Sequence, residues 1–305
     1  MAAFLLRRLV MTILMLFLVA LVVFSLGHLS GDPVRLMVPD EATEEQMAKL
    51  RHELGLDRPL SVQFVDFVTH AMYGDIGVSL RFRKPALTLV LDRMPATIEL
   101  STAAMAIALL VAIPAGIVSA MRPGSLADTA VSTVAITGQA LPAFWIGIVL
   151  IILFAVRLGW LPASGRGDIT NLILPAVTLG LWPMARISRL LRSSLREVAQ
   201  EEFVRTARAK GLRERAILGR HTLRNACIPV VTIIAIIFGT MLGGTVVTET
   251  VFAWPGIGRL ALEAVFNRDF PLVQATVFVV AVIFVFINFF LDLVYVAIDP
   301  RIRLD

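Results

Sequence analysis

Cysteine and histidine are scarce in this sequence, and their scarcity limits the chemistry that the chain can perform. Cys227 is the single cysteine, so an internal disulfide is excluded and we expect it to be a small apolar packing residue. The histidines are spread along the chain at spacings that predict no metal site. They are His28, His52, His70 and His221.

Lysine is also rare, and its placement excludes a familiar nucleotide site. The lysines are Lys49, Lys84 and Lys210, and none of them follows a glycine. A loop that holds nucleotide phosphates needs glycines that end in Gly-Lys-Ser or Gly-Lys-Thr. We therefore predict no nucleotide site and no enzymatic activity in this chain. Work against a gradient would draw its energy from another polypeptide or from an ion gradient.

Charge of either sign is sparse, which excludes an ordinary soluble domain. Charged residues make up 17% of the chain and hydrophobic residues 57%, with a mean hydropathy of +0.82, whereas about a quarter of a soluble domain is charged. Apolar runs of about 20 residues, each long enough to cross a bilayer as a helix, recur along the chain. The predicted fold is an all-α membrane protein with six transmembrane helices. The predicted spans are roughly Leu9–Leu29, Ile98–Met121, Val131–Val156, Leu172–Ala185, Ile228–Thr248 and Leu272–Ala297.

The first span is predicted to be an uncleaved anchor with its arginines inside. Arg7 and Arg8 precede an apolar run that is longer than a signal peptide requires, and no small-residue cleavage site follows. Six spans then place both termini in the cytoplasm. The short loops agree, because arginines concentrate on the side assigned to the cytoplasm.

The stretch between the first two spans is predicted to be a helical extracytoplasmic cap. Thr43 and Gln46 form a capping-box pattern, Gly55 supplies a helix stop, and a second helix is expected from near Pro59 to Tyr73-Gly74. The second span is expected to open at Pro95-Ala96-Thr97. In that reading Thr97 caps the helix and Glu99 lies in its first turn.

Polar side chains are few inside the predicted spans. Some of them either line an aqueous path or bond between helices, and spacing alone leaves both readings open. As substrate-pathway candidates we select Gln139, Thr240, Thr245 and Asn288. Gly239-x-x-x-Gly243, followed by Gly244, is predicted to let another backbone approach closely, so that helix packing is the expected role.

The segment between the fourth and fifth spans is strongly basic. From Arg186 to Arg224 it holds eleven Arg or Lys against four Glu, a net 11 − 4 = +7, while the whole chain carries +5. We predict a helix over Glu197–Lys210, a turn at Gly211, a second helix over Glu214–Leu223, and Pro229 in the first turn of the fifth span. Ala207 and Gly211, four residues apart, are expected to form a flat patch for a partner.

Three readings of this segment compete. The simplest is topological, with arginines that hold the loop inside and bind lipid phosphates. Nucleic-acid binding is disfavoured, because a loop held to the bilayer at both ends cannot enter a groove. The third reading is a docking helix for a soluble partner.

A known family favours the docking reading. The EAA loop of type-1 permease subunits in bacterial ABC importers resembles residues 205–212, RTARAKGL, followed later by Ile228-Pro229. Ala207 and Gly211 match the family pattern, whereas Arg205 and Thr206 replace its Glu and first Ala, as is typical of the DppB/OppB-like permeases of peptide and nickel importers. Further similar segments are Gly31-Asp32-Pro33, residues 53–59, 93–97, 158–165 and 249–258, and Asp299-Pro300-Arg301.

The resemblance implies a function and a set of partners. It implies a permease subunit in the bacterial inner membrane that forms half of the pathway for di- or oligopeptides or a similar small solute. A second DppC/OppC-like permease, two ATP-binding subunits that hold ATP and Mg, an extracytoplasmic solute-binding protein and membrane lipid are the implied partners. No cofactor is expected in this chain. The ATPase-coupling role is carried onto Arg205, Thr206, Ala207, Gly211 and Leu212.

The resulting division of the chain has four parts, and two other functions remain as alternatives. Residues 1–30 are the first span, 31–97 the extracytoplasmic loop, 98–297 a five-helix core with the coupling loop at 186–226, and 298–305 a cytoplasmic tail. A secondary, ion-coupled transporter is the main alternative, although predicted mid-span charge is nearly absent. A membrane scaffold without transport is the other. The sequence does not identify the cargo among dipeptides, longer peptides, glutathione, nickel chelates and haem.

Overall fold

The structure is a computed structural model that describes residues 2–29, 34, 43–53 and 55–298. Every named element within these residues is helical. The helices are α1 (Ala2–Leu29), α3 (Glu44–Glu53), α4 (Leu60–Met72), α5 (Ala86–Met121), α6 (Leu126–Ala140), α7 (Ala143–Leu150), η1 (Ile151–Arg157), α8 (Ile169–Val198), α9 (Glu202–Ala209), α10 (Glu214–Ala216), η2 (Ile217–Thr222), α11 (Leu223–Leu242), α12 (Val246–Val251), α13 (Ile257–Phe266) and α14 (Phe270–Ile298).

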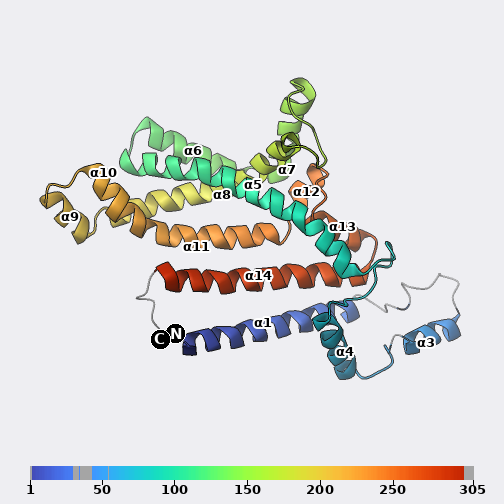
Figure 1. The fold of residues 1–305 in the computed structure, drawn as a ribbon. Coiled ribbons are helices and arrows are strands. Elements are labelled where there is room, and N and C mark those ends of the chain that lie inside the picture. The colour runs from blue at the N-terminus through green and yellow to red at the C-terminus, as the bar shows by residue number, and fades with distance from the viewer. Residues whose placement is uncertain (1, 30–33, 35–42, 54, 299–305) are drawn as a thin grey trace.

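The long helices lie side by side in one elongated bundle (Figure 1). α8, α11, α14 and α1 follow one another across it, and α5 crosses α8. We call the end that carries α9 and α10 the loop end; α3, α4 and α13 lie at the opposite end. α1 begins and α14 ends at the loop end, so both lead to the same side of the bundle.

Four described helical stretches are long and apolar enough to cross a membrane: Arg7–Ser25, Ala86–Met121, Ile217–Leu242 and Phe270–Phe290. A fifth candidate is the pair Leu126–Ala140 and Ala143–Arg157, which is bent by 103°. The predicted count of six spans is therefore not confirmed. The predicted fourth span, Leu172–Ala185, falls within α8. The second half of α8 carries four arginines, which make the helix as a whole less apolar than the other long helices.

Two of the predicted spans differ from the observed helices. The predicted third span, Val131–Val156, is not one continuous helix, because Pro142 holds Leu141 in an extended conformation (φ −84°, ψ 133°) between α6 and α7. The predicted start of the second span is also wrong: α5 begins at Ala86, with Pro95 inside it. Glu99 is consequently well inside the helix, where it pairs with Arg166 at 2.6 Å.

Thr97 is far from the start of α5 and has a different role from the predicted cap. Its hydroxyl donates to Glu249 Oε1 (2.9 Å) and accepts the Ile257 N–H (2.8 Å). Glu249 Oε2 also accepts the Arg259 N–H. Thr97 and Glu249 therefore satisfy the first free N–H groups of α13 and join α5 to α12 and α13.

The helices predicted between the first two spans are confirmed. The Thr43 and Gln46 side chains bond reciprocally to each other's backbone N–H groups at the start of α3. Gly55 has φ +65° just after α3 ends. α4 follows Pro59 and ends before Tyr73.

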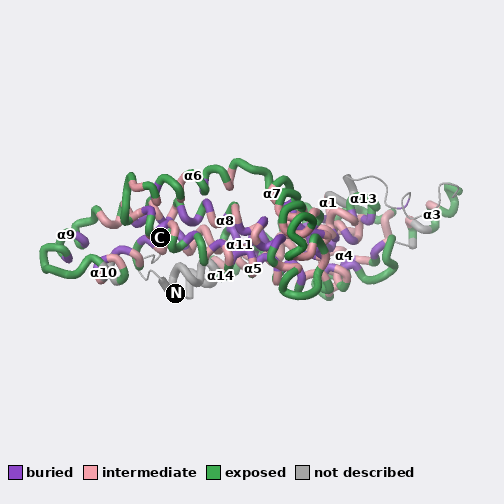
Figure 2. Tube along the Cα trace, turned by 90° about the horizontal axis from the view of Figure 1, so that it is seen from above, coloured by how far each residue is buried: buried purple, intermediate pink, exposed green. Residues whose placement is uncertain are grey.

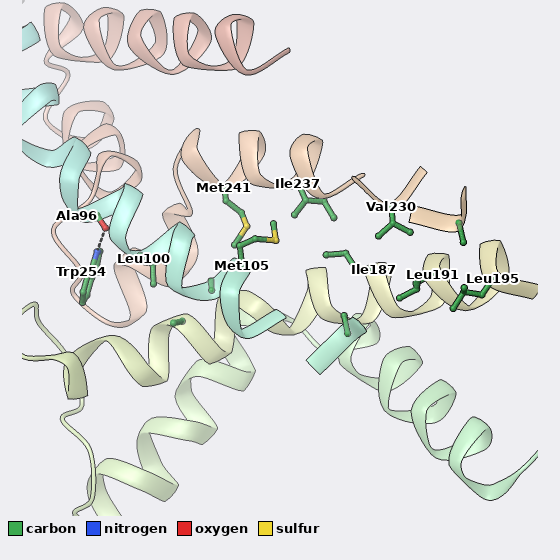
Figure 3. Close-up of a cluster of buried hydrophobic side chains, with 14 residues drawn as sticks. Ala96, Leu100, Met105, Ile187, Leu191, Leu195, Val230, Ile237, Met241 and Trp254 are labelled. Atoms are coloured by element: carbon green, nitrogen blue, oxygen red, sulfur yellow. Dashed lines mark hydrogen bonds between the residues drawn. The ribbon is translucent and has the colours of Figure 1, made fainter. Parts of the chain in front are cut away.

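The main core lies between α5, α8 and α11. Its buried side chains include Leu100 and Met105 of α5, Ile187 and Leu191 of α8, and Ile237 of α11 (Figure 3). At one edge of the core, the Trp254 indole donates to the carbonyl of Ala96 at 2.8 Å, as the dashed line in Figure 3 marks. This core attaches α8 firmly to the rest of the bundle.

Small residues allow the helices to approach closely. A Cβ on Gly180 of α8 would lie 2.8 Å from the carbonyl oxygen of Ala104, and one on Gly116 of α5 would lie 2.9 Å from that of Ser188. Helix packing at Gly239 and Gly243 is confirmed, but what approaches them from α14 is the side chains of Ile287 and Val280 and not another backbone.

We predict that Gly180→Ala destabilises the protein, because the added methyl meets backbone that has no free rotation. Overpacking of this kind costs about 1–3 kcal/mol. Gly138→Ala is the matched control, because Gly138 is also helical but nothing lies within 4 Å of its missing Cβ. That control is expected to gain up to about 1 kcal/mol from helix propensity. Thermal unfolding of both variants in mild detergent, followed by tryptophan fluorescence, measures the difference. Equal melting temperatures would contradict the close contact.

Candidate functional site

The basic segment forms a small helical hairpin at the loop end. α8 ends at Val198, α9 follows a short turn, and Gly211 separates α9 from α10. Gly211 has φ +76°, which favours glycine. The Leu212 N–H donates to the Ala207 carbonyl, and the Gly211 N–H donates to the Arg208 carbonyl. This pair of bonds is a Schellman ending, and the predicted turn at Gly211 is confirmed.

The helices on the two sides of this turn differ from the prediction. Before the turn, the predicted helix Glu197–Lys210 is interrupted between Val198 and Glu202. After the turn, the helix is more continuous than predicted. α10, η2 and α11 then run together from Glu214 to Leu242. Pro229 therefore lies inside α11 and not in the first turn of a separate span. The hairpin is thus joined directly to a membrane-spanning helix.

A minimal core holds the hairpin together. Val204 and Ala207 of α9 pack with Ile217 of η2, and all three are buried. Across the turn, Arg208 Nε donates to Glu214 Oε1 at 2.8 Å. This hydrogen bond to the Glu214 carboxylate raises the pKa of Arg208 above its usual value.

The predicted coupling residues divide into two groups. Arg205, Thr206, Gly211 and Leu212 are exposed, and the ribbon over α9 is mostly exposed in Figure 2. Ala207 is only 6% exposed. It therefore packs the hairpin from within and does not form the expected flat patch with Gly211.

A ladder of arginines fastens α8 to α6, and sequence reasoning missed it. We call it the arginine ladder: Arg189, Arg192 and Arg196 lie three and four residues apart on one face of α8. Arg189 donates to Gln139, and Arg192 donates to Ser132. Arg192 and Arg196 both pair with Asp128, at 2.8 and 2.9 Å.

Asp128 is the centre of this ladder. Its side chain is 5% exposed and also accepts hydrogen bonds from the Ser119 hydroxyl and the Gly124 N–H. It therefore joins α5, the turn before α6, and α8. A sequence signal was present: Ser125 is followed three residues later by Asp128, and the Ser125 hydroxyl indeed accepts the Asp128 N–H at the start of α6. The partners on α8 are too distant in sequence to be read from that pattern.

The four pathway candidates are not joined by hydrogen bonds to one another. Gln139 belongs to the arginine ladder. The Thr240 hydroxyl donates to the Ile237 carbonyl, and the Asn288 amide donates to the Phe284 carbonyl, both within their own helices. The Thr245 hydroxyl oxygen is buried without a partner among the described residues. Lining of a pathway by these side chains stays a prediction.

The described residues also give no metal centre. Within them, no group of three or more His, Cys, Asp or Glu side chains is placed to hold a metal ion. The features available for function are thus the exposed hairpin, the arginine ladder and the apolar spans.

Comparison with solved structures supports the fold. The chain resembles the inward-facing MetNI methionine ABC transporter, with a TM-score of 0.56 and 21% identity over 70% of this chain and 98% of that one. It also resembles an amino acid ABC transporter crystallised with histidines, with a TM-score of 0.55 and 15% identity over 68% of this chain and 92% of that one. At these identities the likeness shows the fold alone.

Comparison with known sequences shows the family. Residues 112–304 match the model described as "Binding-protein-dependent transport system inner membrane component", and residues 1–101 match that family's N-terminal model. The di/tripeptide transport system permease protein DppB of Pseudomonas aeruginosa is 41% identical over 99% of both chains. The glutathione transport system permease protein GsiC of Salmonella typhimurium is 42% identical over 98% of both. The chain therefore belongs to the family of inner-membrane permease components of binding-protein-dependent ABC transport systems.

Proposed function

We propose that this chain forms half of the translocation pathway of an ATP-driven importer and couples that pathway to ATPase subunits through the α9–α10 hairpin. The observation that carries the proposal is the hairpin itself. It presents Arg205, Thr206, Gly211 and Leu212 at the loop end of a chain whose family supplies the membrane component of such systems.

The proposed cargo is a di- or oligopeptide or a similar small solute. The support is the names of the relatives, which include permeases for di/tripeptides and for glutathione, each matched over almost the full chain. An ion-coupled secondary transporter is not favoured, because the family is defined by a binding protein and the sequence relatives belong to ABC systems.

The proposed assembly follows the family. A second, related permease would complete the pathway, two ATP-binding subunits holding ATP and Mg would bind at the loop end, and a solute-binding protein would deliver cargo at the opposite end. In this arrangement the loop end is cytoplasmic, with both termini inside. The chain would cross the membrane six times, with the bent α6–η1 pair and α8 as the additional passages, and residues 31–97 would lie largely outside.

The coupling mechanism we propose is transmission of a rigid-body motion. α9 follows α8 after a short turn, and α8 packs against α5 with its backbone in direct contact at Gly180 and Gly116. The arginine ladder adds α6 to the same unit. A pull on the hairpin by an ATPase would therefore move these helices together and open one side of the pathway as it closes the other.

We predict that Gly211→Asn uncouples transport. Asn tolerates the left-handed backbone of Gly211 better than other residues, so the turn is kept while a side chain enters the docking surface. Stimulated ATP hydrolysis and peptide uptake are expected to fall by about tenfold or more, equivalent to about 1.4 kcal/mol of lost coupling. Both are measured in proteoliposomes with the assembled transporter.

The control for this prediction is Gly124→Asn. Gly124 also has a positive φ (+74°), also lies in open space, and belongs to the turn between α5 and α6. Its N–H, which Asp128 accepts, is retained in the variant. Uptake should stay near normal with Gly124→Asn. Normal uptake with Gly211→Asn as well would remove the support for docking at this turn.

We also predict that Asp128→Asn weakens the arginine ladder. The substitution keeps the shape of the side chain but leaves the partly buried guanidinium groups of Arg192 and Arg196 without a carboxylate to balance their charge. The free energy of unfolding and the peptide uptake per ATP hydrolysed should both fall. Glu99→Gln is the comparison, because it removes an ion pair that is more than a third exposed on both sides and is worth at most about 1 kcal/mol. Equal losses in both variants would show that the ladder does not fasten α8.

A further inference from the structure

The helix α4 has an apolar face that nothing in the described chain covers. Val65 and Met72 lie seven residues apart on this face and are 61% and 82% exposed. Val62 and Thr69 continue the same stripe, so that it runs the length of α4. The Thr69 hydroxyl donates to the Val65 carbonyl at 2.6 Å, which satisfies its polar proton without water. We call Val62, Val65, Thr69 and Met72 the free face of α4.

The opposite face of α4 packs against the bundle. Phe64 contacts the rings of Phe17 and Phe24 of α1, with centroid separations of 5.5 and 5.4 Å. Phe67 and Ala71 pack against the buried cluster formed by α5, α13 and α14. α4 is thus attached to the bundle by one side only.

The polar residues of α4 are gathered in a separate strip. Gln63, Asp66 and His70 follow one another at three- and four-residue steps. Gln63 donates to the carbonyls of Leu56 and Arg58, and Asp66 pairs with Arg58 at 3.3 Å. The helix therefore has one apolar face on the bundle and a free apolar face, with the narrow polar strip between them on one side.

The position of α4 along α1 places it at membrane depth. Phe17 and Phe24 both lie within the apolar stretch Arg7–Ser25 of α1. Because Phe64 contacts both Phe17 and Phe24, α4 lies beside the span and not beyond it. Figure 1 shows α4 lying crosswise to α1 at its end, while α3 extends away from the bundle.

The surroundings of α4 favour lipid as the occupant of its free face. α1 is exposed around most of its circumference, with Val10, Ile13 and Leu14 each more than half exposed, and only 11% of its apolar window is buried. An exposed apolar span of this kind is suited to contact with acyl chains, and so is the exposed apolar free face of α4. Tyr73, 88% exposed at the end of α4, has the amphipathic ring that is enriched where hydrocarbon meets headgroups.

We infer that α4 is an interfacial helix whose free face is embedded among the acyl chains of the leaflet at the opposite end from the hairpin. Its partner is the lipid surface, and the helix anchors the segment between α1 and α5 to the membrane. The inference rests on membership of a membrane-protein family and not on the cargo or the ATPase, so the coupling proposal can fail without affecting it.

The test uses site-specific fluorescence in the assembled transporter. Cys227→Ala removes the single cysteine, and Val65→Cys or Met72→Cys then places one bimane label on the free face. His70→Cys, on the polar strip of the same helix, and Lys49→Cys, on the exposed surface of α3, are the matched controls. Each labelled transporter is placed in nanodiscs, with lipid-bound nitroxide and dissolved iodide as the two quenchers.

We expect the stronger of the two quenchers to differ between the two faces of α4. Labels at Val65 and Met72 should be quenched several-fold more by nitroxide lipid than by iodide, whereas labels at His70 and Lys49 should show the opposite order. Quenching of Val65 by iodide would place the free face in water and overturn the inference. Protection of Val65 from both quenchers, or protection only after a binding protein is added, would show that another protein covers the face and would equally overturn it.

Discussion

The close approach of α5 and α8 is the constraint on which the rest of this structure depends. At Gly180 and Gly116 the two helices touch through backbone atoms, with no room for a side chain on either glycine. Ile187 and Leu191 extend the contact into the main core. Because the hairpin follows the end of α8, any force on the hairpin reaches α5 through this contact. The interface is too tightly packed to deform gradually, which suits a bundle that moves as a unit.

Charge is used sparingly and for attachment. Asp128 is enclosed by Ser119, Arg192 and Arg196, and Glu249 is enclosed by Thr97 and the first N–H groups of α13. Each carboxylate joins segments that are distant in sequence, one on the side of the hairpin and one on the side of α13. In a chain whose helices share an apolar surface with lipid, apolar contact alone does not distinguish one neighbour from another. These buried carboxylates supply specific attachments to α5, one at Ser119 near its end and one at Thr97 within it.

The parts of the fold that local chemistry determines could be predicted from the sequence. The capping pair Thr43 and Gln46, the turn at Gly211 and the apolar helices all follow from residues close together in the chain. The bend at Pro142 has a local cause that a count of apolar residues overlooks. The partners of Asp128 could not be predicted, because they lie on a helix distant in sequence. Ala207 illustrates the same limit within the candidate site. Its spacing from Gly211 suggested a surface patch, but packing against Ile217 turns it inward.

Contact between the hairpin and an ATP-binding subunit is the central claim, and a crosslinking measurement tests it most directly. A single cysteine is placed at Leu212, which is 44% exposed in the hairpin, or at Ile169, which is 78% exposed at the start of α8, in a Cys227→Ala background. A short thiol-to-amine crosslinker is then added to the assembled transporter in membranes. The account predicts a product that joins Leu212→Cys to the ATP-binding subunit and none from Ile169→Cys. Absence of that product from Leu212→Cys, in a preparation that still hydrolyses ATP during uptake, would contradict it.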